Sequence, residues 1–340
     1  MFDLTLSAEQ EALLNAVAGF IRRELPIDRL RPKPGAFLPV PVADDWSRFG
    51  ELGWLGLSLP ESSGGAGYGL PEEVVVFHEF GRYLLTPCLL ASVVAAQLAH
   101  HCGDLATARG LASGEHRVAV ALPIDQALTG SDHNCHLLDA SSAKMVLLLG
   151  GALDLYERSA FADVLEVTGL DPSVPLQRAR LSVRVRPLLS SSDIFLLNRT
   201  SILISAMQSG ITEASLDLAV EYAKLREQFG RPIGSFQAIK HKCADMAVNA
   251  EAATSQTRLA ALSLGNRLAD ADYQVASAAV IANRAATANG EECIQIHGGM
   301  GFTVECDAHL FLKRALLNAR LLGGTELALE RVLASSNAMD

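Results

Sequence analysis

Basic side chains are concentrated in one stretch of this chain, KLREQFGRPIGSFQAIKHK, which runs from Lys224 to Lys242. The one acid there, Glu227, stands against five cations: Lys224, Arg226, Arg231, Lys240 and Lys242. Gly230-Arg231-Pro232 interrupts a helical pattern, which indicates a junction between two helices. Helix N-termini favour anions through their free N–H groups and the helix dipole. The stretch therefore suits a polyphosphate, although a solvated turn with basic caps fits the composition equally well.

A second stretch whose residue types could bind a ligand or take part in a reaction is QIHGGMGF, from Gln295 to Phe302. It lies between two expected helices. Its three glycines permit close approach of the backbone to a ligand, while Gln295 offers an amide and His297 a ring nitrogen. The alternative is a glycine helix end followed by a turn. In that case His297 is a packed or surface histidine rather than a base.

The third stretch is LLGGTELALE, from Leu321 to Glu330, where two adjacent glycines interrupt a helical pattern. Glycine in a helix interior costs roughly 0.5 to 1 kcal/mol relative to alanine, so the pair at Gly323 and Gly324 needs a reason. Spacing alone favours a helix end followed by a new N-cap at Thr325. The other explanation is that the backbone approaches a ligand here.

The composition of the whole chain limits the partners of these stretches. Its 340 residues fit two or three domains, and 49% of them are hydrophobic, which is ample for a core. The formal net charge of −10 argues against nucleic acid or an anionic membrane surface as the main partner. An anionic ligand therefore requires a local basic site.

The cysteines and the apolar runs indicate a protein of the cytoplasm. The six cysteines lack metal-ligand spacing and are expected to be buried thiols in a reducing compartment. The opening MFDLTLSAEQ does not have the pattern of a signal peptide. The longest apolar run, around Met145 to Leu155, is far below the roughly 18 residues of a membrane span. We expect cytoplasmic localisation, with no membrane span.

Periodicity predicts a helical segment over residues 1–117. The residues SAEQEALLNAVAGFIRREL have apolar positions at helical spacing, with Ser7 as the N-cap. A loop with four glycines follows later in the segment, at positions 64, 65, 67 and 69. It lacks the spacing of the known glycine-rich phosphate-binding motifs, so an ordinary loop is favoured.

Residues 118–195 change to short apolar runs and are expected to form a compact β domain. The runs are RVAVAL, KMVLLLG, DVLEVTGL and ARLSVRVRPLL. In the last run Leu181, Val183 and Val185 alternate with polar residues, which predicts a half-buried strand.

Residues 196–340 return to long amphipathic, alanine-rich helices. Four such helices with short connections predict an antiparallel bundle. The fold class expected from the sequence is therefore mainly α with a central β domain. The expected domains are a helical N-terminal domain (1–117), a β domain (118–195) and a helical bundle (196–340).

Two of the segments carry a resemblance to a known family. YAKLREQFGRPIGSFQAIKHKCADM and CIQIHGGMGFTVECDAHLFLKRA resemble the two C-terminal signatures of the acyl-CoA dehydrogenase family, in the same order and at the family's separation. ELGWLGLSLPESSGGAGYGLPEEVVVFHEFGR resembles the N-terminal helical domain of that family. The resemblance covers nearly the whole chain. It implies a helical domain, a small β-barrel or sandwich domain and a C-terminal four-helix bundle.

The resemblance implies an FAD flavoprotein that oxidises the α,β-carbon bond of an acyl-CoA thioester. In the family a glutamate removes the α proton and flavin N5 accepts the β hydride. The C-terminal helices of one subunit hold the ADP half of FAD that is bound mainly by a neighbouring subunit. The residues that would contact FAD by position are Arg226 at the pyrophosphate, Gln228, Phe229 and Gln237 beside it, Gln295, Gly298 and Gly299 at the adenosine end, and Thr325.

The catalytic glutamate of the family is missing from this sequence. Where the family usually has Glu-Gly-Thr, this chain has Gly323-Gly324-Thr325. Some members carry the base about one turn into the first helix of the C-terminal bundle, which falls near Thr200 here, and no acid is present there. Glu213 lies ~20 Å further along that helix by the helical rise. A positioned base is worth roughly 10² to 10⁴-fold in rate, so its loss matters.

The β segment also departs from the family. Only Gly130-Ser131-Asp132 remains of the segment Thr-Glu-Pro…Gly-Ser-Asp, and the family's Lys-x-Trp-Ile-Thr is absent. Both tryptophans, Trp46 and Trp54, lie in the N-terminal segment. The part of the fold that would hold the flavin ring and acyl chain is therefore shortened, whereas the part that would reach a neighbour's FAD is retained.

These departures lead to one main hypothesis and two alternatives. The main hypothesis is a subunit of a heteromeric acyl-CoA dehydrogenase, an α₂β₂ heterotetramer, whose homologous partner supplies the glutamate. The resemblance implies electron-transfer flavoprotein as a further partner and β-oxidation of a fatty acid or a steroid side chain as the pathway. The first alternative is a self-sufficient homo-oligomer that uses Glu326 or His297 as an unusual base. The second is a non-enzymatic assembly protein on the same fold.

Overall fold

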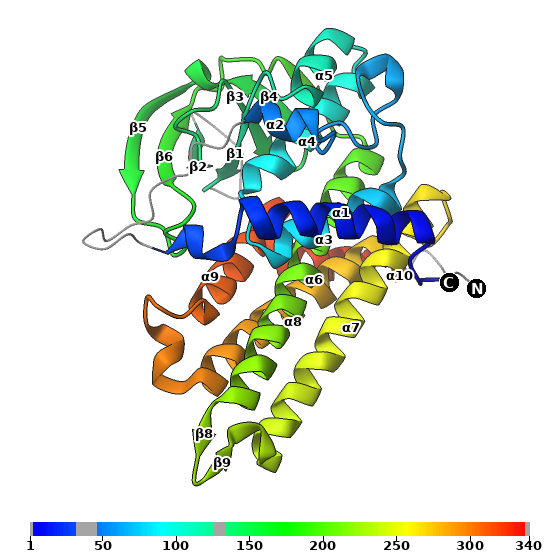
Figure 1. Cartoon of the computed structure of the whole chain (residues 1–340). Coiled ribbons are helices and arrows are strands. Elements are labelled where there is room, and N and C mark those ends of the chain that lie inside the picture. The colour runs from blue at the N-terminus through cyan, green and yellow to red at the C-terminus, as the bar shows by residue number, and fades with distance from the viewer. Residues whose placement is uncertain (1–2, 32–45, 125–132, 337–340) are drawn as a thin grey trace. The chain divides into compact units, whose positions relative to one another are not determined.

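The computed structural model describes residues 3–31, 46–124 and 133–336 (Figure 1). The chain divides into two compact units. The bundle unit comprises Met1–Val40, Val74–Leu84 and Ser201–Asp340, and the sheet unit comprises Pro41–Glu73 and Leu85–Thr200. The expected three-domain division at residues 117 and 195 stays a prediction. The segment at positions 130–132 lies outside the described residues.

Helices make up most of both units. The bundle unit contains, wholly or in part, α1 (Ala8–Glu24), α3 (Leu70–Arg82), α6 (Ile194–Leu225), α7 (Gln237–Gly265), α8 (Ala271–His297), α9 (Ala308–Asn318) and α10 (Gly324–Ser336). The sheet unit contains α2 (Trp46–Glu51), α4 (Pro87–His101) and α5 (Leu105–Ala112). Short 3-10 turns are η1 (Ile27–Leu30), η2 (Glu61–Ser63), η3 (Arg158–Ala160), η4 (Ile233–Ser235), η5 (Gly298–Phe302) and η6 (Leu321–Gly323). Helices α3 and α6 begin in the sheet unit and end in the bundle unit.

Local sequence signals set the start of the first helix. The Ser7 hydroxyl accepts from the Gln10 backbone N–H at 3.2 Å, and the Gln10 side chain accepts from the Ser7 N–H at 3.1 Å. This reciprocal pair is a capping box, which satisfies two N–H groups that the helix itself cannot. The predicted N-cap at Ser7 is confirmed.

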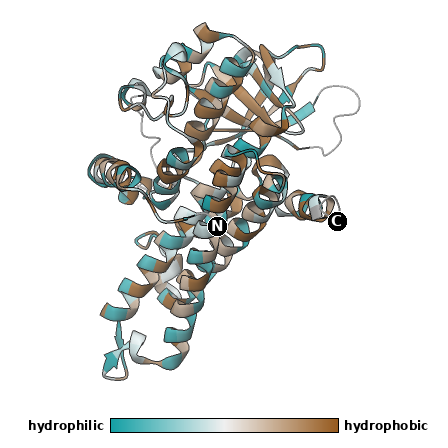
Figure 2. Ribbon diagram, turned by 90° about the vertical axis from the view of Figure 1, so that its right-hand side faces the viewer, coloured by the Kyte–Doolittle hydropathy of each residue, from teal (hydrophilic) through white to brown (hydrophobic). Residues whose placement is uncertain are grey.

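Seven strands form one mixed sheet among the described residues of the sheet unit. They are β1 (Val118–Pro123), β2 (His133–Leu138), β3 (Met145–Leu149), β4 (Leu153–Glu157), β5 (Phe161–Val167), β6 (Leu176–Leu181) and β7 (Leu189–Ser191). The order is β5-β6-β2-β1-β3-β4-β7, in which only β1 and β3 are parallel, with Val118 opposite Met145. β3 is buried along its whole length, and Figure 2 shows hydrophobic residues gathered in the strands. The predicted fold class, mainly α with a central β region, is confirmed.

The expected strand through Val183 and Val185 is wrong. β6 ends at Leu181, and the Val185 N–H donates to the Ser182 carbonyl at 3.0 Å in a turn. Val183 and Val185 are 50% and 40% exposed. Among the described residues, Leu181 is the last residue of β6 that pairs with β2 and β5, so no described strand lies opposite Val183 and Val185. Alternation alone cannot keep a strand where no neighbour supplies hydrogen bonds.

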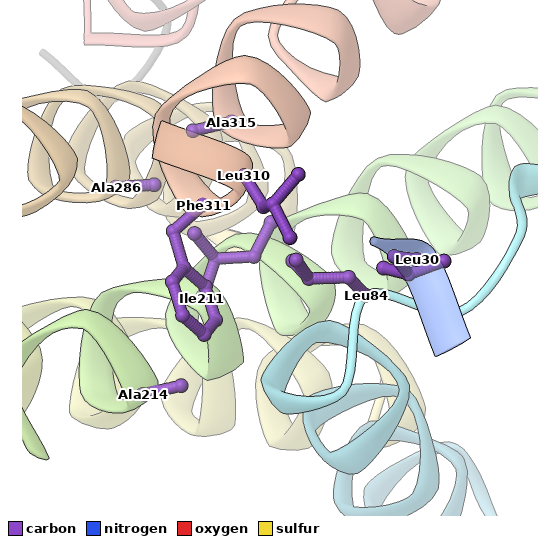
Figure 3. Close-up of a cluster of buried hydrophobic side chains, with 8 residues drawn as sticks. All are labelled: Leu30, Leu84, Ile211, Ala214, Ala286, Leu310, Phe311 and Ala315. Atoms are coloured by element: carbon purple, nitrogen blue, oxygen red, sulfur yellow. The ribbon is translucent and has the colours of Figure 1, made fainter. Parts of the chain in front are cut away.

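The bundle core is built from small and branched residues of several helices. One buried cluster joins Leu84, Ile211, Ala286 and Phe311 with Leu30, Ala214, Leu310 and Ala315 (Figure 3). Helices α3 and α6 approach each other at glycines: a methyl group added at Gly210 would lie 1.9 Å from the His78 carbonyl oxygen. Glycine is therefore required for this close crossing of the two helices.

Candidate functional site

The basic stretch folds into a tight β-hairpin between α6 and α7 (Figure 1). Strands β8 (Glu227–Gln228) and β9 (Arg231–Pro232) pair antiparallel, and the Ile233 N–H donates to the Arg226 carbonyl at 2.8 Å. The two loop residues, Phe229 and Gly230, have φ of 54° and 76°, which is typical of a type I′ turn. The Phe229 side chain is 91% exposed at the tip.

Not every cation of the basic stretch is available to a ligand. Lys224 pairs with Glu221 at 2.7 Å, and Lys242 pairs with Glu292. Arg231 lies over the ring of Phe236, 4.1 Å from its centroid. Arg226 is exposed and makes no ion pair within the described ranges of the chain. Its guanidinium therefore remains available for an anion, and its fork of N–H donors suits a phosphate.

The start of α7 adds backbone donors next to the hairpin. Gln237 is the first residue of the helix and is exposed, and the N-cap residue Phe236 makes no side-chain cap. The first N–H groups of this 29-residue helix thus lack a side-chain acceptor. Together with the helix dipole they favour a negatively charged group.

The glycine stretch forms the end of α8. The helix ends at His297, and Gly298 follows with φ of 62°, a conformation that suits glycine. A methyl group added at Gly298 or Gly299 would meet nothing within 4 Å, so the backbone there is open to an approaching ligand. Gln295 is exposed in the last turn of the helix.

The structure brings these two stretches together, although about 70 residues separate them in the sequence. The His297 ring stacks on Tyr222, with centroids 4.1 Å apart and an interplanar angle of 24°. Beneath it, a hydrophobic cluster includes Ala223 of α6, Met246 of α7, Ile294 of α8 and Ala308 of α9. Arg226, Gln237 and Gln295 therefore belong to helix ends that share one core, at one end of the bundle unit.

Thr325 lies elsewhere in the bundle unit. α10 begins at Gly324, one residue before the expected N-cap, and Leu322, Gly323 and Gly324 all have positive φ. This turn borders a small cavity of about 30 Å³ that Ala279 and Asn283 of α8 also line. Ala279 is 16 residues from Gln295, or roughly 24 Å along the helix. Thr325 therefore does not join the cluster around Arg226 within one chain.

Neither of the two positions that the resemblance gives for the catalytic base carries an acid. Gly323 has no side chain, and no carboxylate is among the described residues that line the cavity next to the turn. Thr200 is fully buried, and its hydroxyl donates to the Leu196 carbonyl at 2.8 Å. A fully buried threonine hydroxyl is out of reach of a ligand, and an alcohol is too weak a base to replace a carboxylate.

The other ionisable candidates have structural contacts or lie outside this cavity. His297 is buried, and its Nδ1 lies 2.7 Å from the Cys293 carbonyl, to which it donates. Glu213 lies 2.6 Å from Arg82 and 3.0 Å from His78, and the hydrogen bond with His78 lowers the pKa of Glu213 to about 2. Glu326 is exposed and does not line the cavity. None of the three is among the residues that line the cavity beside Gly323.

Other features have weaker links to function. In the four-glycine loop, a methyl group at Gly65 would lie 2.1 Å from the Leu59 carbonyl, so the loop is closed on itself, as an ordinary turn would be. Phe229 was expected from the sequence as an FAD contact, but four further exposed apolar side chains in the residues around the hairpin and η5 were not: Leu225, Met300, Phe302 and Val304. Their unusual concentration in sequence near two glycine turns was the signal from which these residues could have been found.

No group of histidine, cysteine or acidic residues suited to a metal occurs among the residues that the structure describes.

No helix in the described ranges is both long enough and apolar enough to cross a membrane.

Two family models match the chain. The model of the acyl-CoA dehydrogenase N-terminal domain matches residues 7–109, and that of the acyl-CoA dehydrogenase C-terminal domain matches residues 194–336.

Similar proteins carry the same designation. Acyl-CoA dehydrogenase IpdE2 of Mycobacterium tuberculosis is 35% identical over 284 residues, which cover 83% of each chain. Acyl-CoA dehydrogenase FadE34 of the same organism is 37% identical over 298 residues, which are 84% of this chain but 41% of that protein. Among solved structures, the ChsE4-ChsE5 complex from M. tuberculosis contains a chain with a TM-score of 0.79 at 23% identity, covering 99% of both chains.

Proposed function

Because the chain belongs to the acyl-CoA dehydrogenase family, whose cofactor is FAD, we propose that it is one subunit of a heteromeric acyl-CoA dehydrogenase, an α₂β₂ heterotetramer. A homologous partner subunit supplies the catalytic glutamate and the pocket for the flavin ring. This chain supplies contacts to the diphosphate and adenosine end of FAD.

The observation that carries the proposal is the difference between the hairpin end of the bundle unit and the two positions for a base. At the hairpin end, an unpaired Arg226, the uncapped start of α7 and the open glycines 298 and 299 suit a diphosphate. At the turn before α10, Gly323 carries no side chain, and in the sheet unit Thr200 is buried, so neither position that the resemblance gives for the base has an acid. A chain that can bind the cofactor but cannot remove the α proton needs a partner.

Each residue of the FAD half-site has a defined task in this proposal. Arg226 forms charge-assisted hydrogen bonds with the diphosphate, while Gln228 and Gln237 offer amide groups beside it. The exposed Phe229 ring covers an apolar surface of the partner subunit. Gln295, Gly298 and Gly299 allow the adenosine end to approach the backbone, and Thr325 contacts the cofactor from the start of α10. When bound, FAD supplies the hydride acceptor of the reaction.

The exposed apolar side chains around the hairpin support an oligomeric assembly. Phe229, Phe302 and Leu225 are 91%, 75% and 79% exposed, which is unusual for large apolar residues. Apolar side chains gathered on one face of a monomer are typical of protein interfaces. A structural neighbour, ChsE4-ChsE5, is itself a complex of two differently named chains. We extend that kind of pairing to this protein, with an acyl-CoA as substrate and electron-transfer flavoprotein as electron acceptor.

The substrate is proposed as a CoA thioester with a bulky acyl group, such as a fatty acyl or steroid side chain in β-oxidation. Glycine at position 323 occupies less volume than the family glutamate, and the β segment lacks the family's tryptophan-containing motif. Both differences leave more room on the side of this chain that would face an acyl chain.

Purification alone and with a homologous chain that carries the family glutamate tests the proposal. We expect this chain alone to be colourless or weakly yellow and inactive in dye reduction with an acyl-CoA. With the partner, we expect a yellow complex of both chains that turns over. A yellow homo-oligomer with full activity would support a self-sufficient enzyme instead, and a complex without FAD would support a non-enzymatic assembly protein.

A further inference from the structure

A cluster of charged side chains surrounds a buried histidine at the crossing of α3 and α6, away from every residue assigned to FAD. The His78 ring is nearly buried, with Nε2 at 3.0 Å from Glu213 and Nδ1 at 3.4 Å from Glu79. Glu79 is itself 5% exposed. The histidine therefore lies between two carboxylates, one from its own helix and one from α6.

Further charges reach this cluster from every element packed around it. From α3, Arg82 lies 2.6 Å from Glu213 and 3.6 Å from Glu79. The same guanidinium lies 2.7 Å from Asp217, also on α6. From α7, Arg258 lies in electrostatic range of Glu213, and from α1, Arg22 lies in range of Glu79. Apart from the solvent-exposed Arg22, the cluster contains three cations, protonated His78, Arg82 and Arg258, and three carboxylates, Glu79, Glu213 and Asp217.

A cavity of about 130 Å³ adjoins the histidine. His78, Glu79, Glu213 and Arg258 line it on the polar side. A cavity of this size with charged walls has room for several water molecules. Water in it would give the ring a route for protons.

The N-terminal segment closes one side of this cavity. Leu6 and the α1 residue Leu14 form part of its lining. Arg258 also donates to the Leu4 carbonyl at 3.1 Å, so one guanidinium connects the cluster to the N-terminal segment. Any change in the charge near Arg258 is therefore transmitted to the residues that cover the cavity.

We propose that this cluster is a proton-operated latch, in which protonated His78 holds α3 to α6 through Glu79 and Glu213, and loss of that proton releases the segment Leu4–Glu24. Without the proton, two carboxylates lose a shared cation. Glu213 then attracts Arg258, which weakens its hydrogen bond to Leu4, and water enters beneath Leu6 and Leu14.

The direction of the pH dependence follows from the surroundings of the ring. Burial lowers the pKa of His78, but hydrogen bonds and charges from Glu213 and Glu79 outweigh it, so the pKa is raised above its ordinary value. A raised pKa in the folded state stabilises the closed segment below the ordinary pKa of about 6.5. That stabilisation is lost as the pH rises through the folded-state pKa of His78.

Hydrogen exchange of the full-length chain between pH 6 and pH 9.5 tests the latch. After correction for intrinsic exchange rates, protection of peptides within Leu4–Glu24 should fall in one step as the pH rises. The expected loss is about tenfold for each pH unit by which the folded pKa exceeds the unfolded one. The proposal is overturned if the wild-type profile shows no such step.

Three variants test whether the fall in protection of Leu4–Glu24 is caused by loss of the His78 proton. His78→Gln should give the low protection at all pH values, because the ring charge is absent. Glu213→Gln should move the step to lower pH, because the ring loses its nearest carboxylate. His101→Gln, at an exposed histidine of α4, should leave the wild-type profile unchanged. A step that persists in His78→Gln would contradict the proposal. If His78→Gln does not fold, the shift in Glu213→Gln decides.

Discussion

At position 200 the threonine hydroxyl has a partner in its own helix, the Leu196 carbonyl, and no access to solvent. Position 323, where the resemblance places the family glutamate, is a glycine with φ of 85°. A side chain placed on Gly323 would be strained by that backbone conformation and would meet Leu327 at 2.6 Å. A single substitution that introduces a glutamate at position 323 would therefore be strained.

Arg226→Ala should weaken FAD binding by the reconstituted complex about 10 to 100-fold, as expected for loss of hydrogen bonds between charged groups worth about 1.5–3 kcal/mol. Arg226→Lys should recover only part of the loss, because an ammonium lacks the planar fork of donors. Titration of apo-complex with FAD, followed by flavin fluorescence, measures the change. Lys224→Ala is the matched control, since its ammonium already pairs with Glu221. Equal losses in both variants would mean that Arg226 acts only through net charge.

The ion pairs of Glu213 should make the free energy of unfolding depend on pH in the acid range. Its folded pKa of about 2 lies below the ordinary value of 4.5, so its ion pairs stabilise the fold above the ordinary pKa and lose this effect as pH falls toward 2. The wild type should exceed Glu213→Gln in free energy of unfolding at pH 6, and the difference should shrink toward pH 2.5. Urea unfolding at several pH values measures it. A difference that stays constant with pH would show that the charge of Glu213 does not contribute.

Among the elements, the sequence predicts helices better than it predicts strands. The start of α1 was predictable because Ser7 and Gln10 form a cap that needs only neighbouring residues. The strand through Val183 was wrong, because strand formation depends on a partner that lies far away in sequence. The basic stretch was predicted as a helix junction, but not as a hairpin with Phe229 at its tip.

Substitution by alanine should have opposite effects at a glycine in the crossing of α3 and α6 and at a glycine on the exposed face of α1. Gly210→Ala places a methyl group 1.9 Å from a backbone oxygen of α3, which should destabilise the protein by about 1–3 kcal/mol through overpacking. Gly19→Ala, on α1 with nothing within 4 Å, should stabilise it by about 0.5–1 kcal/mol. Chemical denaturation at neutral pH compares the two. A neutral Gly210→Ala would mean that the helices separate at little cost.

A substitution at the hairpin tip should weaken assembly with the partner subunit without changing the stability of this chain. Phe229→Asp should leave the thermal midpoint of this chain nearly unchanged, because the ring is exposed. It should weaken association with the partner subunit by about 30-fold or more, as for an interface hot spot worth at least 2 kcal/mol. Analytical ultracentrifugation of mixed subunits measures the association. Leu170→Asp is the control, because Leu170 is also an exposed apolar residue but lies in the sheet unit. Unchanged association of Phe229→Asp would remove the hairpin from the interface.

At the scale of the whole molecule, the sequence indicated the class of cofactor site but not how its parts meet. The resemblance predicts Arg226, Gln295 and Gly298 as FAD contacts, and in the structure the Tyr222–His297 stack joins their helix ends. That contact connects positions far apart in the chain, so no local pattern predicts it. The separation of Thr325 from the others likewise depends on the length of α8 and on the turn that starts α10. The cofactor would therefore meet this chain at two surfaces, as expected if it is shared between subunits.

The central claim is that this chain binds FAD but does not abstract the proton. Stopped-flow reduction of the flavin by an acyl-CoA in the reconstituted complex tests it most directly. We expect unchanged reduction rates when this chain carries Glu326→Gln, and loss of reduction by at least about 10²-fold when the glutamate of the partner subunit is replaced by glutamine. Fast reduction that survives the change in the partner but disappears with Glu326→Gln would contradict the account.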